Sequence, residues 1–138
     1  MVNKQKMTEI KKITKIALVY NAIVTFLFAI LLILLTEFFL TPLTGWTNPL
    51  SPRNFGGLCL LSAIFSVILL RKKEWEEIKL TYAFIFSFFT MTIPIELIVM
   101  GVLWSTLSVA AISQTILNQI LMISIFSLGV LSYYKQQH

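Results

Sequence analysis

Glu96 is the acidic residue of this sequence that lies inside a hydrophobic run rather than beside one. Pro94, which interrupts helical hydrogen bonding, stands two positions before it. Three amide side chains follow in the same stretch, residues 90–119: Gln114, Asn118 and Gln119. A carboxylate within a membrane costs roughly 2.5–3.5 kcal/mol on insertion scales and by default marks a functional site. Chemistry in this chain is therefore expected first around Glu96.

The elements that would position this acid are two helices joined by a turn near Ser105. In that register Glu96 lies level with Gln114, and Thr92 lies level with Asn118. Residues four apart share a helix face, so two polar pairs could form between the helices. The sequence thus predicts a ligand- or ion-binding site made of Glu96, Thr92, Gln114 and Asn118.

Three interpretations of this polar group remain open. Glu96 could be protonated and simply hydrogen-bond to Gln114, which would hold two helices together. It could instead bind a proton, a cation or a polar ligand, or it could contact a partner subunit. No basic residue is expected level with it, and Arg53 is the nearest candidate.

Composition places the chain in a bilayer. The 138 residues are 57% hydrophobic and 12% charged, with a mean hydropathy of +0.85. Soluble domains are about 25% charged, and they must present much of their surface to water. We therefore expect an all-α integral membrane protein of one domain, residues 1–138, at the cell membrane and in contact with the lipid bilayer.

Several kinds of site are excluded by counting. Cys59 is the single cysteine and His138 the single histidine, so the chain alone offers no disulfide, bis-histidine haem, iron–sulfur cluster or Cys/His zinc site. We expect no cofactor and no metal. The net charge of +5 comes from bases that flank apolar runs, which is a topology signal, so no nucleic-acid partner is expected.

Hydrophobic runs predict a four-transmembrane-helix antiparallel bundle with spans at about 16–36, 52–70, 80–103 and 107–134. Residues 97–134 carry no charge and would extend ~57 Å as one helix, so a reversal must lie within them. In the first span Asn21 and Thr25 share a face and should point at another helix. Small residues in the second span favour close helix packing; they are Gly56, Gly57, Cys59, Ser62, Ala63 and Ser66.

Two connections stand out. Residues 37–51 are rich in proline and in apolar side chains, including Trp46 and Pro49, which predicts an interfacial outer loop. Glu37 and Arg53 flank this loop and are candidate charge partners. Ser51 is expected to cap the second span, with Pro52 at its first position. Residues 71–79 predict a tight charged turn.

Trp75, in that charged turn, is expected at the level of the lipid headgroups. Every Lys and Arg except Arg53 lies in the N-terminal flank, the 71–79 turn or the C-terminal tail. The positive-inside rule then predicts a multi-pass protein with both termini in the cytoplasm. The N-terminal flank, Lys4 to Lys15, either is solvated or lies on the inner membrane surface.

The stretch from Trp46 to Trp75 carries a family likeness. A loop with Trp46, Pro49 and Leu50 is followed by Arg53 and Gly56, which open a helix of small residues, and a basic turn closes it. This pattern resembles the DoxX-like membrane proteins, a group of small prokaryotic four-span proteins. The resemblance covers about 30 residues and implies a four-helix bundle. It brings no catalytic residue to this chain.

These features support three hypotheses for function. The leading one is a non-enzymatic accessory or interaction subunit, either self-associating as a homo-oligomer or joined to partner membrane subunits. The second is a small channel or transporter with its polar site around Glu96. The third is a membrane enzyme or redox-complex subunit acting on a lipid or quinone, although the spans hold no nucleophile–base pair and no paired carboxylates.

Overall fold

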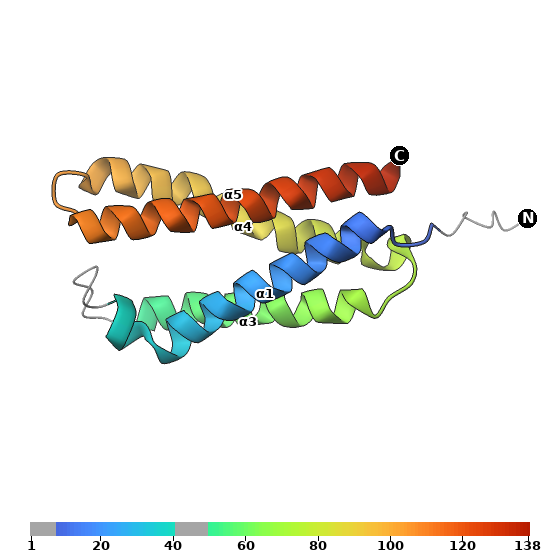
Figure 1. Cartoon of the computed structure of the whole chain (residues 1–138), viewed down its shortest axis with the longest axis horizontal. Helices are drawn as coiled ribbons and strands as arrows, with labels where there is room; N and C mark the ends of the chain where they lie inside the picture. Colours follow the sequence, from blue (N-terminus) through green and yellow to red (C-terminus); the bar gives the residue numbers. More distant parts are fainter. Residues whose placement is uncertain (1–7, 41–49) are drawn as a thin grey trace, which may run out of the picture.

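The structure, a computed structural model, describes residues 8–40 and 50–138 and is drawn in Figure 1. Four helices in it are long and apolar enough to cross a membrane: α1 (Lys12–Leu34), α3 (Leu50–Leu70), α4 (Trp75–Leu103) and α5 (Val109–Gln137). A short π-helical segment, η1 (Thr36–Leu40), follows α1. This confirms the predicted fold of four apolar helices. The middle of the expected outer loop, with Trp46 and Pro49, lies outside the described residues, as do Lys4 and Lys6.

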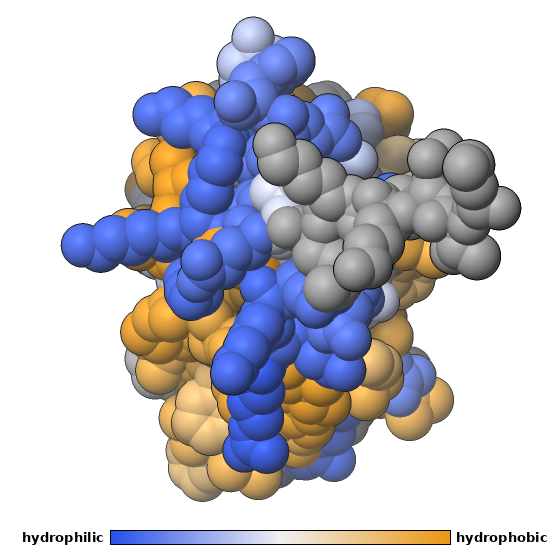
Figure 2. Space-filling view, turned by 90° about the vertical axis from the view of Figure 1, so that its right-hand side faces the viewer, coloured by the Kyte–Doolittle hydropathy of each residue, from blue (hydrophilic) through white to orange (hydrophobic). Residues whose placement is uncertain are grey.

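The helices form two antiparallel pairs, α1 with α3 and α4 with α5, and the pairs meet mainly through α1 and α5. The start of α1 and the C-terminal end of α5 lie at one end of the molecule, together with the α3–α4 connection (Figure 1). We call this the termini end. The opposite end, where Leu103 precedes the turn into Val109, is the hairpin end. Figure 2 looks onto the termini end and shows hydrophilic residues gathered there, with hydrophobic flanks beside them.

The helices extend beyond the predicted spans at the termini end. α1 begins at Lys12 and not at residue 16, and α4 begins at Trp75 and not at residue 80. The predicted bounds excluded charged residues, but a helix can continue past the hydrocarbon because lysine stems lie along apolar surface with the charge in water. Residues 71–74 alone form the connection, so the predicted 71–79 turn was too long.

The start of α3 differs from the prediction. The helix begins at Leu50, so Ser51 lies within it and is not its N-cap. Pro52 still falls in the first turn, where backbone N–H groups have no intrahelical acceptor and a missing one costs little. The predicted loop 37–51 is correspondingly shorter, because Glu37 belongs to the π-helical segment.

Small and polar residues set the α1–α3 contact, as the sequence predicted. Asn21 and Thr25 are buried, and the Asn21 amide donates to the hydroxyl oxygens of Ser62 (3.0 Å) and Ser66 (2.8 Å) on α3. A Cβ on Gly56 would lie 2.8 Å from a side-chain carbon of Ile33 on α1. Because lipid supplies no hydrophobic drive, such close contact is what holds two spans together.

Aromatic side chains fill the core near the termini end. Trp75 is 3% exposed, with its ring centroid 5.4 Å from that of Tyr82 and 5.3 Å from that of Tyr133. Trp75 is therefore packed inside the helix bundle, and its expected depth at the level of the lipid headgroups stays a prediction. Position 75 is the first residue of α4 and faces α5, so the packing between these helices takes the side chain inward.

Gln136 of α5 joins the segment before α1 and the first turn of α1 to α5 at the termini end. Its side-chain oxygen accepts from the Lys11 backbone N–H (2.7 Å) and the Thr14 hydroxyl (2.9 Å), while its amide donates to the Glu9 carbonyl (2.9 Å). The segment before α1 also pairs with the α3–α4 connection, because Ile10 N–H donates to the Lys73 carbonyl (3.1 Å). Residues 8–11 thus pack against the bundle, and Ile10 is buried.

Candidate functional site

Glu96 lies between α4 and α5, about 10 Å of helix from the end of α4 at Leu103. Its carboxylate accepts three hydrogen bonds from amide groups of α5. Asn118 donates to both oxygens, at 2.5 and 2.7 Å, and Gln119 donates to one of them at 2.7 Å. The two helices are therefore joined by a carboxylate–diamide cluster, which we define as Glu96, Asn118 and Gln119.

The cluster differs from the predicted pairs by one helical turn. Glu96 meets Asn118 and not Gln114, while the Thr92 hydroxyl donates to the Phe89 carbonyl of its own helix (2.7 Å). Side chains lean toward the N-terminus of their helix. In this hairpin Glu96 leans away from the turn and Asn118 leans toward it, so the facing partner comes from further along α5. The predicted register used Cα positions alone.

Gln119 was missed as a member of the site by the sequence argument. It is 7% exposed, and besides Glu96 its amide approaches the carbonyl of Ile93, next to Pro94, at 3.4 Å. The sequence held a signal for its burial, because Gln119 recurs at helical spacing with Ala111 and Met122, and all three face inward. That spacing marks the buried face of α5, on which Gln119 lies.

Three buried amide oxygens of α5 have no hydrogen-bond partner within the described residues: those of Gln114, Asn118 and Gln119. A buried acceptor without a donor costs about 1–3 kcal/mol, and more in hydrocarbon, where water cannot help. The oxygens of Asn118 and Gln119 belong to the side chains that donate to Glu96, so oxygen atoms without donors lie beside the carboxylate. Such a group suits a donor from another helix, a proton or a small cation.

No basic residue neutralises Glu96 within the part of the chain that the structure describes. Arg53 instead pairs with Glu37 at the hairpin end, with 2.9 Å between nitrogen and oxygen, and both side chains are exposed. The structure thus brings these two flanking residues together, away from the cluster. An exposed pair of this kind contributes only about 0–1 kcal/mol.

The surroundings of the cluster are thinly packed. Within α4, all of which is described, every buried residue lies between Trp75 and Phe89. Beyond that point one face of the helix carries four exposed apolar side chains at spacings of four, three and four, which we call the α4 stripe: Met91, Ile95, Ile98 and Val102. The hairpin-end half of α4 therefore has no fully buried residue, although it carries the acid.

The described residues offer little for other chemistry. Among residues 8–40 and 50–138 no three His, Cys, Asp or Glu side chains come together as a metal site. Cys59 is fully buried against the α1–α3 contact and is a packing residue there. The carboxylate–diamide cluster is the strongest candidate for function.

No family model, curated protein or solved structure matches this chain. The resemblance to DoxX-like proteins therefore stays a prediction that rests on the residues between Trp46 and Trp75. What the four helices do show is a multi-pass membrane protein with a helical bundle fold.

Proposed function

We propose that this protein is a non-enzymatic interaction subunit, which self-associates or joins other membrane subunits through the hairpin-end half of α4 and α5. One observation carries the proposal. Beyond Phe89, α4 has no buried residue, yet this half of the hairpin holds Glu96 and the unpartnered amide oxygens.

An apolar face alone would need no cover, because lipid tails solvate it as well as leucine does. A carboxylate is different, since charged and polar groups in spans almost always face other helices or a water-filled cavity. Helices from a second chain, packed along the α4 stripe, would exclude lipid from the cluster.

Gly101 supports this choice of surface. It lies beside Val102 of the α4 stripe, and a Cβ built on it meets no atom within 4 Å. Small residues let helices from different chains approach closely in lipid. We further propose that the termini end is cytoplasmic, following the basic residues gathered there, and that the fold is of the DoxX-like kind.

Native mass spectrometry of the gently extracted protein tests the proposal. We expect a homo-oligomer or a complex with another membrane protein. Gly101→Leu should at least halve the assembled fraction, because the larger side chain fills the proposed contact. Gly57→Leu is the matched control, since Gly57 also has open space around it but lies on α3. A strictly monomeric, partner-free wild-type protein would overturn the proposal, as would equal effects of the two substitutions.

The oxygen-rich cluster favours one second candidate, a channel or transporter for a proton or small cation. Its prediction is distinct, because Glu96→Gln would abolish cation flux into liposomes while leaving assembly intact. The interaction proposal expects no flux from the wild-type protein and normal folding of Glu96→Gln, whose side-chain oxygen still accepts from Asn118.

A further inference from the structure

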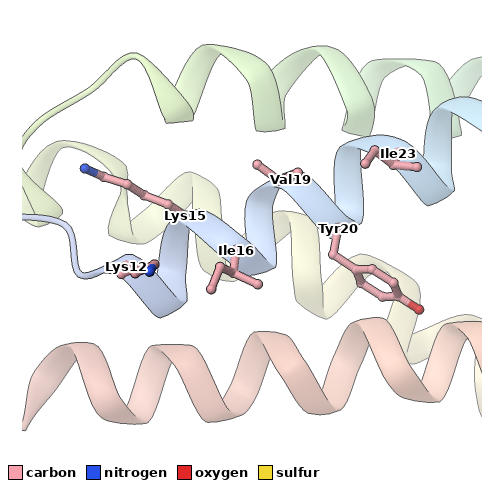
Figure 3. Close-up of a pocket in the computed structure, with 6 residues that line it drawn as sticks. All are labelled: Lys12, Lys15, Ile16, Val19, Tyr20 and Ile23. Carbon is pink, nitrogen blue, oxygen red and sulfur yellow. The ribbon is translucent and has the colours of Figure 1, made fainter.

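The termini-end half of α1 carries two adjoining depressions on its surface, both shallow and open. One lies between side chains of α1 alone, which are Lys12, Lys15, Ile16, Val19, Tyr20 and Ile23. The other is lined by Glu9, Ile10, Lys11, Lys12 and Lys15. Lys12 and Lys15 belong to both, so the two form one groove with a charged end and an apolar end. Figure 3 shows the two lysines at one end and Ile23 at the other.

The charged end has an excess of positive charge. Three lysines and one glutamate line it, which leaves a formal charge of about +2. Neither Lys12 nor Lys15 forms an ion pair within the described residues, whereas Lys72 and Lys79 at the same end pair with Glu77 and Glu76. The Lys11 ammonium donates to the Lys135 carbonyl at 2.5 Å. Lys12 and Lys15 are thus available to an anion.

The groove as a whole has the length of one membrane leaflet. From Lys12 to Ile23 a helix rises ~16 Å, about half of the ~30 Å hydrocarbon core, and the apolar part from Ile16 to Ile23 makes up ~10 Å of this rise. Tyr20 forms part of the wall and reaches α5, where its hydroxyl lies 2.7 Å from that of Ser124. Ile16, Val19 and Ile23 are exposed along the same stretch.

Charge and polarity select the occupant. The lysines at the charged end attract an anion, and Ile16, Val19 and Ile23 are apolar and exposed next to them. The occupant must therefore be anionic at the membrane surface and apolar below it.

We propose that this groove binds one anionic glycerophospholipid, with its phosphate between Lys12 and Lys15 and one acyl chain along Ile16, Val19 and Ile23. Lys11 adds positive charge near the headgroup. Glu9 lowers the net positive charge there, so the site favours a headgroup of small negative charge. The site is separate from the carboxylate–diamide cluster and does not depend on the proposed interaction role.

Native mass spectrometry with an equal mixture of phosphatidylglycerol and phosphatidylcholine tests the site. The wild-type protein should retain one phosphatidylglycerol in preference to phosphatidylcholine. Each basic residue near a membrane surface contributes about fivefold in affinity for an anionic lipid, so Lys12→Gln combined with Lys15→Gln should weaken retention roughly 30-fold. Lys72→Gln combined with Lys79→Gln makes the same charge change outside the groove and should stay within about twofold of wild type.

A second variant distinguishes lipid binding in the groove from general attraction to the positive charge of the termini end. Val19→Trp leaves the charge unchanged and fills the apolar part, so it should also displace the retained lipid. Val19 is exposed, and the fold does not depend on its size. Equal retention of both lipids by the wild type would overturn the proposal. So would equal losses in the two lysine pairs, or full retention in Val19→Trp.

Discussion

Glu96 shows how a single acid can be held within an apolar hairpin. Three amide hydrogen bonds reach its two oxygens, and all come from α5. Hydrogen bonds to a charged acceptor are stronger than neutral ones, so the cluster offsets part of the cost of placing the acid in hydrocarbon. The remaining free-energy cost comes from the amide oxygens that have no hydrogen-bond donor.

A double-mutant cycle measures the strength of this cluster. We expect Glu96→Leu and Asn118→Leu each to lower the free energy of unfolding by about 1–2 kcal/mol, with a coupling of roughly 0.6–1.7 kcal/mol, the range found for interhelical bonds in membranes. Unfolding in mixed detergent gives both quantities. Thr92→Val is the control, because its hydroxyl bonds within α4 and should show no coupling to Asn118. Coupling as large for Thr92 as for Glu96 would contradict the observed register.

At the scale of helices, a close approach of α4 to α5 depends on one glycine. A Cβ on Gly129 would lie 2.3 Å from a ring carbon of Phe86, well inside any contact that real side chains make. Beside it the Tyr82 hydroxyl bonds to Ser132 and to the Gly129 carbonyl. The ring of Phe86 is held by Tyr82, with 4.5 Å between centroids, so it has little freedom to move aside.

Gly129→Ala should therefore destabilise the protein by about 1–3 kcal/mol, the usual cost of overpacking, despite the higher helix propensity of alanine. Gly57→Ala is the matched control, because nothing lies within 4 Å of its added Cβ. It should be neutral or slightly stabilising. Thermal unfolding in detergent compares the two, and equal stability of both variants would mean that α4 and α5 are further apart than described.

The sequence predicts helix faces better than it predicts register or tertiary contacts. The small residues of α3 predicted its buried face, because lipid leaves packing of small side chains as the main attraction between spans. The contacts of Trp75 with Tyr82 and Tyr133 were not predicted, because they depend on how α4 and α5 pack together. The pairing of Glu96 with Asn118 depends on side-chain tilt and turn length, which spacing along one helix does not contain.

At the scale of the whole molecule, packing is uneven between the two ends. The aromatic cluster around Tyr82 and the bonds of Gln136 close the termini end, and the Tyr20–Ser124 bond joins the two helix pairs in the same half. The hairpin-end half of α4 contributes no buried residue. The proposed contacts with other chains therefore belong to the hairpin-end half, where α4 is least packed within its own chain.

The orientation of this uneven molecule in the membrane has a direct test. Single cysteines at Ser105, in the α4–α5 turn, and at Lys73, in the α3–α4 connection, probe opposite ends, and both sites are exposed. In a Cys59→Ala background, we expect Ser105→Cys to react with a membrane-impermeant maleimide on intact cells. Lys73→Cys should react only after permeabilisation, because the proposed orientation keeps the basic end in the cytoplasm. The reverse pattern would place the basic groove of α1 outside and refute the proposed orientation.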